Sequence, residues 1–130
     1  MPGPYIAQPA DLVPRATPYG NGQCVALVEA LCGAPHHVQW REGARLADLI
    51  SQPPGIATGT AIATFIAGTY PSKPTGNHAA IFVSAAADRS SVVVFDQWAG
   101  QPPHLRTLYF GRAAGSYSVN NRPEAYSVIL

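Results

Sequence analysis

The stretch Gly-Gln-Cys-Val-Ala-Leu-Val-Glu-Ala-Leu-Cys-Gly-Ala-Pro, residues 22–35, carries the clearest structural pattern in the chain. Its apolar residues recur at the i, i+3, i+4 and i+7 spacing of one helix face and are Cys24, Leu27, Val28 and Leu31. Gly33 and Pro35 end the pattern, because glycine favours helix ends and proline cannot continue a helix. The sequence therefore predicts a helix with a thiol in its first turn.

Beyond this helix the pattern changes to short strands. A weaker helix is predicted over residues 42–50, before the turn Pro53-Pro54-Gly55. The later β-branched or aromatic runs, separated by Gly, Pro, Asn and Ser, are residues 61–66, 78–83, 92–95, 105–110 and 126–130. The connections 84–91 and 96–104 suit antiparallel neighbours. Helices followed by an antiparallel sheet of about five strands indicate the α+β class.

Composition indicates one compact domain over residues 1–130, in which the Pro-rich residues 1–20 form an arm over the body. Hydrophobic residues make up 47% of the chain, enough for an ordinary core. Eight Lys and Arg against seven Asp and Glu leave a net charge of +1 without a basic stripe, which argues against a nucleic-acid partner. The N-terminus has no basic region and no long apolar run, so we expect no signal peptide and no membrane partner.

The two cysteines are expected to be free thiols with different roles. One continuous helix would hold Cys24 and Cys32 about 12 Å apart, too far for a disulfide. Cys32 has no histidine or acid at a suggestive spacing and is predicted to be structural. His36 and His37 lack a further ligand at zinc-like spacing, so we predict a solvated loop there and no metal or other cofactor.

Three residues together suggest a cysteine hydrolase: Cys24 in the first helical turn, His78 at the start of one predicted strand and Asp96 at the end of the next. A thiol becomes a good nucleophile as the thiolate, which a helix N-terminus and a nearby imidazolium both stabilise. A histidine is oriented by a carboxylate that accepts a hydrogen bond from its other ring nitrogen. An antiparallel hairpin of 78–83 and 92–95 would bring His78 and Asp96 within reach.

Simpler interpretations exist for each residue taken singly. Cys24 lies on the apolar face, where a free cysteine is most often a small buried hydrophobe. His78 fits an ordinary strand-edge histidine, and Asp96 fits a turn cap. His104, after two prolines, is expected in a loop rather than in a site. The joint placement of the first three favours the nucleophile over these alternatives.

The string Gly22-Gln23-Cys24 followed by an apolar helix resembles the nucleophile motif of CHAP domains in the papain-like NlpC superfamily. The resemblance continues with a tryptophan soon after the helix, Trp40, with the strand Gly-Thr-Ala-Ile-Ala-Thr-Phe at 59–65, and with Asn-His-Ala-Ala-Ile-Phe at 77–82. Asp96 stands where that superfamily places its third catalytic group. The whole chain is also similar to a small family of leaderless bacterial proteins proposed to be peptidoglycan amidase effectors of type VI secretion.

The resemblance implies hydrolysis of an amide bond in the peptide stem or cross-link of peptidoglycan. Cys24 would attack, His78 would transfer protons, and Asp96 would orient His78. The backbone N–H of Cys24 would meet the oxyanion, with Gln23 as the candidate second donor. CHAP domains commonly have Glu at the third site and an Asn two positions later, whereas this chain has Asp96 and then Trp98, so Gln97 is the candidate for the missing amide.

Three aromatic residues, Trp40, Tyr70 and Trp98, are candidates to line a substrate groove, although packing in the core or at the rim is the first expectation for each. The resemblance further implies synthesis in the bacterial cytoplasm, export to the periplasm of target cells without a leader, contact with secretion-machine components and a cognate immunity protein. Two alternative hypotheses are a non-catalytic wall- or protein-binding module and a thiol acyltransferase on the same scaffold.

Overall fold

A six-stranded antiparallel sheet forms the centre of the molecule, with the strand order β1-β6-β2-β3-β4-β5. The computed structural model describes residues 3–112 and 118–130. The strands are β1 (Glu42–Arg45), β2 (Ala61–Thr64), β3 (Ala79–Ala85), β4 (Ser91–Trp98), β5 (Gln101–Tyr109) and β6 (Tyr126–Ile129). The α-helices are α1 (Cys24–Cys32) and α2 (Leu46–Ile50), and four short 3-10 turns are η1 (Pro9–Asp11), η2 (His37–Gln39), η3 (Val119–Asn121) and η4 (Pro123–Ala125). The predicted α+β class is confirmed.

Alternation along the strands separates two apolar clusters, one on each face of the sheet. On β2, Ala61 and Ala63 join the cluster beneath α1, whereas Ile62 joins the cluster on the other side. On β3, Ile81 and Phe82 divide in the same way, because successive side chains of a strand point to opposite faces. The central strands are therefore buried on both faces, which explains their almost continuous apolar sequence.

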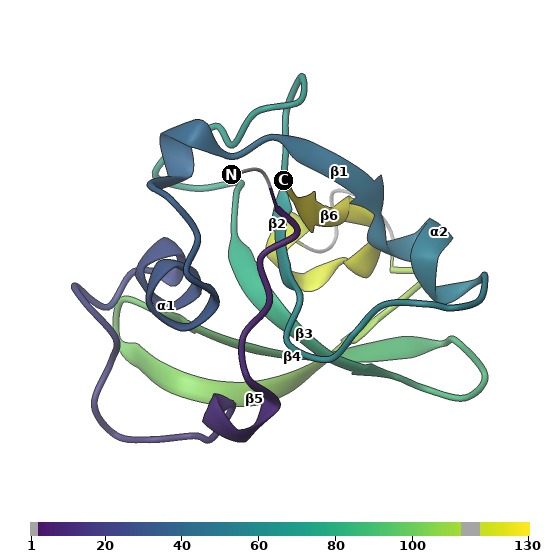
Figure 1. Cartoon of the computed structure of the whole chain (residues 1–130), viewed down its shortest axis with the longest axis horizontal. Coiled ribbons are helices and arrows are strands. Elements are labelled where there is room, and N and C mark those ends of the chain that lie inside the picture. Colours follow the sequence, from purple (N-terminus) through teal and green to yellow (C-terminus); the bar gives the residue numbers. More distant parts are fainter. Residues whose placement is uncertain (1–2, 113–117) are drawn as a thin grey trace.

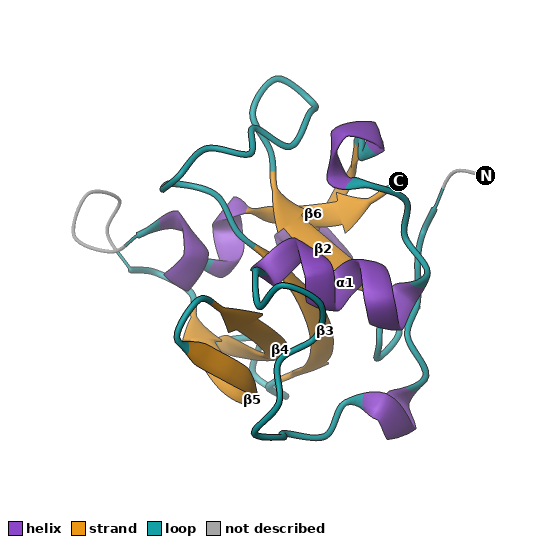
Figure 2. Ribbon diagram, turned by 90° about the vertical axis from the view of Figure 1, so that its left-hand side faces the viewer, coloured by secondary structure: helices purple, strands orange, loops and turns teal. Residues whose placement is uncertain are grey.

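Helix α1 lies across one face of the sheet and packs on β3 and β4 (Figure 2). Leu27 and Val28 on its inner face are fully buried. The helix ends at Gly33, whose left-handed backbone conformation (φ 67°) is one that glycine adopts without strain. Both predicted limits of the helix are confirmed. Cys24, its first residue, belongs to the site described below.

Two parts of the sheet differ from the sequence-based prediction. Residues 42–45 form edge strand β1 rather than the first turn of a helix, so α2 begins only at Leu46. Strands β4 and β5 also extend to a tight turn at Ala99-Gly100, so the predicted connection 96–104 is mostly strand. As a result Asp96 lies within β4 rather than at its end, and His104 lies in β5 opposite Asp96 rather than in a loop.

The N-terminal segment crosses the body of the molecule, as the dark purple trace of Figure 1 shows, and pairs with the residues that lead into β2. Ile6 pairs with Thr60, and the Ala7 N–H donates to the carbonyl of Gly59 at 2.8 Å. Gly59 is required here because a Cβ at this position would collide with the backbone of Ala7, and because its φ is +99°. Within the described residues, no helix has the length and apolarity that crossing a membrane requires.

Candidate active site

Cys24 is the first residue of α1, and the preceding turn holds it there. The Gln23 N–H donates to the side-chain oxygen of Asn21 at 3.0 Å, and Gln23 is the N-cap residue but makes no side-chain cap. The first N–H groups of a helix have no acceptor within the helix, and they carry the positive end of the helix dipole. The half-buried thiol of Cys24 therefore lies beside backbone donors that favour negative charge.

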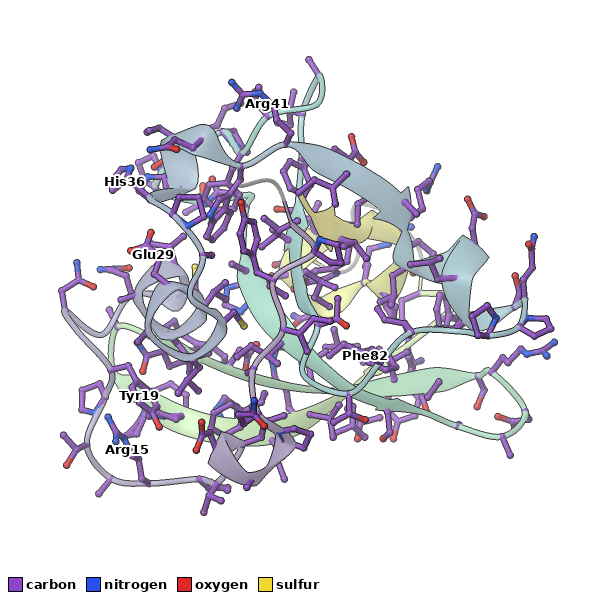
Figure 3. The ribbon with its side chains drawn as sticks, viewed as in Figure 1. Arg15, Tyr19, Glu29, His36, Arg41 and Phe82 are labelled. Carbon is purple, nitrogen blue, oxygen red and sulfur yellow. The ribbon has the colours of Figure 1, made fainter. Side chains whose placement is uncertain are left out.

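Gln97 fixes this turn from the opposite side. Its side chain is fully buried, and its Oε1 accepts from the Tyr19 N–H at 2.9 Å. Its Nε2 donates to the carbonyls of Tyr19 at 2.9 Å and Gln23 at 2.8 Å. In Figure 3, Tyr19 is labelled in the segment that leads into α1, near Arg15, whose guanidinium stacks 3.5 Å from the Tyr19 ring centroid. Gln97 thus ties β4 to the backbone on which Cys24 is mounted.

His78 and Asp96 meet across the β3–β4 hairpin. Ile81 pairs with Phe95, so the same register places Asp96 opposite residue 80. His78 is two residues before that position, and the two side chains are therefore diagonal neighbours on the same face of the sheet. The two side chains are buried, and His78 Nε2 lies 2.8 Å from Asp96 Oδ2. The His78 N–H donates to Thr64 Oγ1 at 2.9 Å, which fixes the backbone of His78 against β2. Because Nε2 is engaged by Asp96, Nδ1 is the ring nitrogen left for Cys24.

Two basic residues on β5 also approach Asp96. Arg106 Nε donates to the same Oδ2 at 2.8 Å, and His104 Nδ1 lies 3.8 Å from Oδ1. Arg106 further donates to Asn121 Oδ1 and to the carbonyl of Asn120. Arg106 is not among the predicted site residues, and His104 is expected in a loop rather than in a strand beside the site. His104 and Arg106 alternate with Leu105, so in a strand they share one face. With that strand opposite the one that contains Asp96, this alternation was the sequence signal for both residues.

The electrostatics of Cys24 and His78 reinforce each other. Burial disfavours the thiolate, but the hydrogen bond with His78, the charge of His78 and a hydrogen bond from Tyr70 outweigh it, so the pKa of Cys24 lies below its ordinary value. Burial disfavours the imidazolium, but the hydrogen bond to Asp96 and the contact with Cys24 outweigh it, so the pKa of His78 is raised. Both shifts favour a thiolate–imidazolium pair.

A cleft of about 330 Å³ opens over this pair. It is lined by Gln23, Cys24, Lys73, Pro74, Thr75, Gly76, Asn77, His78, Trp98, Ser118 and Asn120. One wall is therefore the continuous segment 73–78, and Trp98, with 37% of its surface exposed, forms part of the rim. The side chain of Gln23 is exposed beside the thiol, the position from which an amide can meet a substrate carbonyl.

Two of the three aromatic groove candidates do not line this cleft. Trp40 is fully buried, and its indole N–H donates to the carbonyl of Pro35 at 2.9 Å, so it is a core residue rather than part of the groove. Tyr70 is also buried, but its hydroxyl oxygen lies 3.6 Å from Cys24 Sγ. The apolar body of each ring is packed in the core, and Trp98 alone of the three is at the cleft.

The adjacent histidines are not a solvated pair. His36 is exposed, but His37 is only partly exposed, and its Nε2 lies 3.0 Å from Ser72 Oγ and its Nδ1 3.7 Å from Glu29 Oε2. The loop is therefore fastened to α1 and to the segment that leads to His78. In the described part of the chain, no three His, Cys, Asp or Glu side chains gather closely enough to hold a metal ion.

Comparison with known proteins agrees with this architecture. Residues 7–129 match the family described as "Domesticated amidase effector 2", Dae2. The chain belongs to this family. One relative is the "Type VI secretion amidase effector 2 protein" of Salmonella typhi. It is 31% identical over 137 aligned positions, which cover 97% of this chain and 98% of the relative. The "Domesticated amidase effector 2" of Ixodes scapularis is 36% identical over 68% of this chain and 59% of its own length.

A solved structure shares the fold. The protein titled "Type 6 secretion amidase effector 2 (Tae2)" superposes with a TM-score of 0.77 at 27% sequence identity, covering 98% of this chain and 94% of the other. The resemblance to type VI amidase effectors is therefore confirmed along nearly the whole chain. The predicted arrangement, a cysteine-bearing helix packed on an antiparallel sheet, is confirmed with six strands in place of about five.

Proposed function

We propose that this member of the Dae2 family is a peptidoglycan amidase effector that uses Cys24 as its nucleophile. The supporting observation is the thiol of Cys24 at the N-terminus of α1, next to His78, which is itself 2.8 Å from the buried carboxylate of Asp96. The names of the relatives supply the class of reaction and the type of secretion. The substrate we propose is an amide bond in the peptide stem or cross-link of the bacterial cell wall.

In the first half of the reaction, the Cys24 thiolate attacks the carbonyl carbon of the scissile amide and forms a C–S bond. The carbonyl electron pair moves to oxygen, and the N–H of Cys24 and the exposed amide of Gln23 are the donors proposed for that oxyanion. When the C–N bond breaks, its electron pair leaves with nitrogen, which takes a proton from the His78 imidazolium. The products of this step are a free amine and a thioester on Cys24.

In the second half, neutral His78 removes a proton from water as the water oxygen attacks the thioester carbon. The C–S bond then breaks, which releases a carboxylic acid and restores the thiolate–imidazolium pair. Asp96 keeps the imidazole in one orientation and stabilises the imidazolium through the hydrogen bond at Nε2. Gln97 acts at a distance from the reacting atoms by holding the turn before Cys24, a positioning role.

We further propose that the protein acts in the periplasm of neighbouring bacteria after type VI delivery, and that the producer protects itself with an immunity protein that covers the cleft. The polar rim of this cleft offers the amide, hydroxyl and amino groups of Gln23, Ser118 and Lys73 to such a partner. Covering the cleft would exclude peptide substrate from the Cys24 thiol.

Digestion of purified peptidoglycan tests the nucleophile. Wild type, Cys24→Ala and Cys32→Ala are incubated with the sacculus, and soluble products are separated by chromatography and weighed by mass spectrometry. We expect new peptide fragments from wild type and Cys32→Ala and none from Cys24→Ala, with masses that identify the scissile bond. Fragments from Cys24→Ala would contradict the proposed nucleophile.

Two further outcomes distinguish the alternative hypotheses. Folded wild type that binds peptidoglycan and releases no fragments would indicate a binding module. Transfer of the acyl group from the Cys24 thioester to an added amine in preference to water would indicate an acyltransferase, because the acyl-enzyme chemistry is shared and only the acceptor differs.

A further inference from the structure

Tyr70 is held rigidly beside the nucleophile by aromatic and polar neighbours. Its ring packs edge-on against Trp40, with ring centroids 5.2 Å apart, and against His37, with centroids 5.7 Å apart. Trp40 is fully buried, and His37 is anchored to Ser72. The ring therefore has little freedom, and its hydroxyl is delivered to a point 3.6 Å from Cys24 Sγ.

The direction of the hydrogen bond between Tyr70 and Cys24 follows from a chain of donors. The Lys73 backbone N–H, which can only donate, lies 2.7 Å from one side-chain atom of Asn77, so that atom is the amide oxygen. The other atom of the amide is the NH₂ group, and it donates to the Tyr70 hydroxyl at 3.1 Å. Tyr70 therefore accepts from Asn77. Among residues 3–112 and 118–130, Cys24 Sγ is the acceptor that remains for the hydroxyl proton of Tyr70.

We propose that Tyr70 is a catalytic residue of the proposed amidase, which donates a hydrogen bond to the sulfur of the Cys24 thiolate and is oriented for this by Asn77. This inference rests on the proposed function for its effect on hydrolysis. The proton stays on the tyrosine oxygen throughout, and no bond to it forms or breaks. Sulfur thus has two side-chain partners, the imidazolium of His78 and the phenol of Tyr70.

The chemistry of the phenol suits this role. Burial, together with the charge of Cys24, raises the pKa of Tyr70 above its ordinary value, so the hydroxyl keeps its proton while Cys24 ionises. The hydrogen bond from Tyr70 is also among the causes that lower the pKa of Cys24. Asn77 lines the cleft and donates to Tyr70, which contacts Cys24. Hydrogen bonds therefore connect the cleft wall to the nucleophile.

The pH dependence of thiol alkylation tests the proposal without substrate. Iodoacetamide labelling is followed by intact mass in a Cys32→Ala background, with and without Tyr70→Phe. Loss of one hydrogen bond to a charged group should raise the pKa of Cys24 by about one unit, so that labelling below that pKa slows about tenfold. The plateau at high pH should remain, because the thiol stays accessible. An unchanged profile would overturn the proposal.

Asn77→Ala tests the orienting step. It should shift the profile in the same direction by a smaller amount, and the double variant should match Tyr70→Phe alone, because Asn77 acts through the hydroxyl. Fully additive shifts would show that Asn77 acts independently. Tyr126→Phe is the matched control, since it removes a buried tyrosine hydroxyl that donates to Asn120 rather than to sulfur, and the profile should not move.

Peptidoglycan hydrolysis by the same variants links the hydrogen bond to catalysis. Tyr70→Phe should lower kcat about tenfold at neutral pH with little change in KM. If wild type does not hydrolyse peptidoglycan but the alkylation profile still shifts, the proposed function fails and the assignment of the hydrogen bond stands. If hydrolysis occurs and neither kcat nor the profile responds to Tyr70→Phe, the assignment of Tyr70 fails.

Discussion

The two ends of α1 carry the same amino acid in opposite chemical states. Cys24 at the N-terminus is half-buried beside a cleft, a histidine and a tyrosine, and its pKa is lowered. Cys32 at the C-terminus is buried under the N-terminal segment, and burial raises its pKa to about 12. Its thiol donates to the Gly59 carbonyl, which also accepts from the Ala7 N–H. Reactivity is therefore decided by the neighbours each helix end meets.

The helix itself contributes to this difference. The N-terminus of a helix favours negative charge and its C-terminus disfavours it. The effect is modest at either end, roughly 0.3–1 kcal/mol. Burial adds the larger cost at Cys32, whereas at Cys24 the cost of burial is outweighed by His78 together with the hydrogen bond from Tyr70. His78 is therefore the largest of the contributions that lower the pKa of Cys24.

Alkylation of the folded protein should show the largest effect. At pH 7 the thiolate fraction of Cys32 is about 10⁻⁵, because its pKa is about 12, whereas a thiol with a pKa below 9 has at least about a hundredth of its molecules ionised. Cys24 should therefore react with iodoacetamide at least about a thousandfold faster, as measured by peptide mapping with mass spectrometry. In guanidinium chloride the two rates should converge, and a contrast that persisted there would contradict an origin in the fold.

Removal of the histidine should reduce the contrast. His78→Asn is expected to raise the pKa of Cys24 and to slow peptidoglycan hydrolysis at least about a hundredfold, because it removes both the imidazolium that stabilises the thiolate and the proton donor for the leaving amine. Wild type should show a bell-shaped pH profile of hydrolysis. Activity is lost as pH falls through the lowered pKa of Cys24 and as pH rises through the raised pKa of His78.

The alkylation profile of the same variant provides the check. Its acid limb should move to higher pH, toward that of an ordinary thiol, while the labelling of Cys32 stays unchanged. An acid limb at the wild-type pH would show that the helix N-terminus and Tyr70 alone set the state of Cys24.

The smallest expected effect concerns the support beneath Cys24. Gln97→Ala removes three hydrogen bonds to the turn at Tyr19 and Gln23 and takes away the side-chain acceptor of the part-buried Tyr19 N–H. Unfolding in urea should report a loss of about 1–3 kcal/mol, and hydrolysis should fall severalfold because Cys24 is less well positioned. Gln101→Ala is the matched control, since its amide donates to the carbonyl of the neighbouring Pro102 and its loss should leave both measurements near wild type.

Local patterns were sufficient for much of the fold. The spacing of Leu27 and Val28, with Gly33 after them, is a property of one short segment, and α1 begins and ends where that pattern predicts. The five strands with apolar runs were predicted for the same reason. β1 was missed because Glu42–Arg45 has no apolar alternation, and its pairing with β6 is what makes it a strand.

In the site, too, some features follow from local sequence and others depend on long-range packing. Hairpin spacing between residues 78 and 96 was enough to predict that a histidine and a carboxylate would meet, because the register of two consecutive strands is a local property. The surroundings of that pair depend on long-range packing. Arg106 reaches Asp96 from β5, Tyr70 reaches Cys24 across 46 positions in the sequence, and Gln97 reaches Tyr19 across 78.

The amino-acid sequence by itself therefore determined α1 and the strands with apolar runs, the position of the thiol at a helix N-terminus and the hairpin that joins His78 to Asp96, because each depends on periodicity or spacing within a few dozen residues. Only the tertiary structure decided which contacts lower the pKa of one thiol and raise that of the other, that Trp40 is core while Trp98 faces the cleft, and which donors surround the sulfur. Burial and electrostatic partners come from segments that meet only when the sheet and α1 have packed, and no local pattern encodes them.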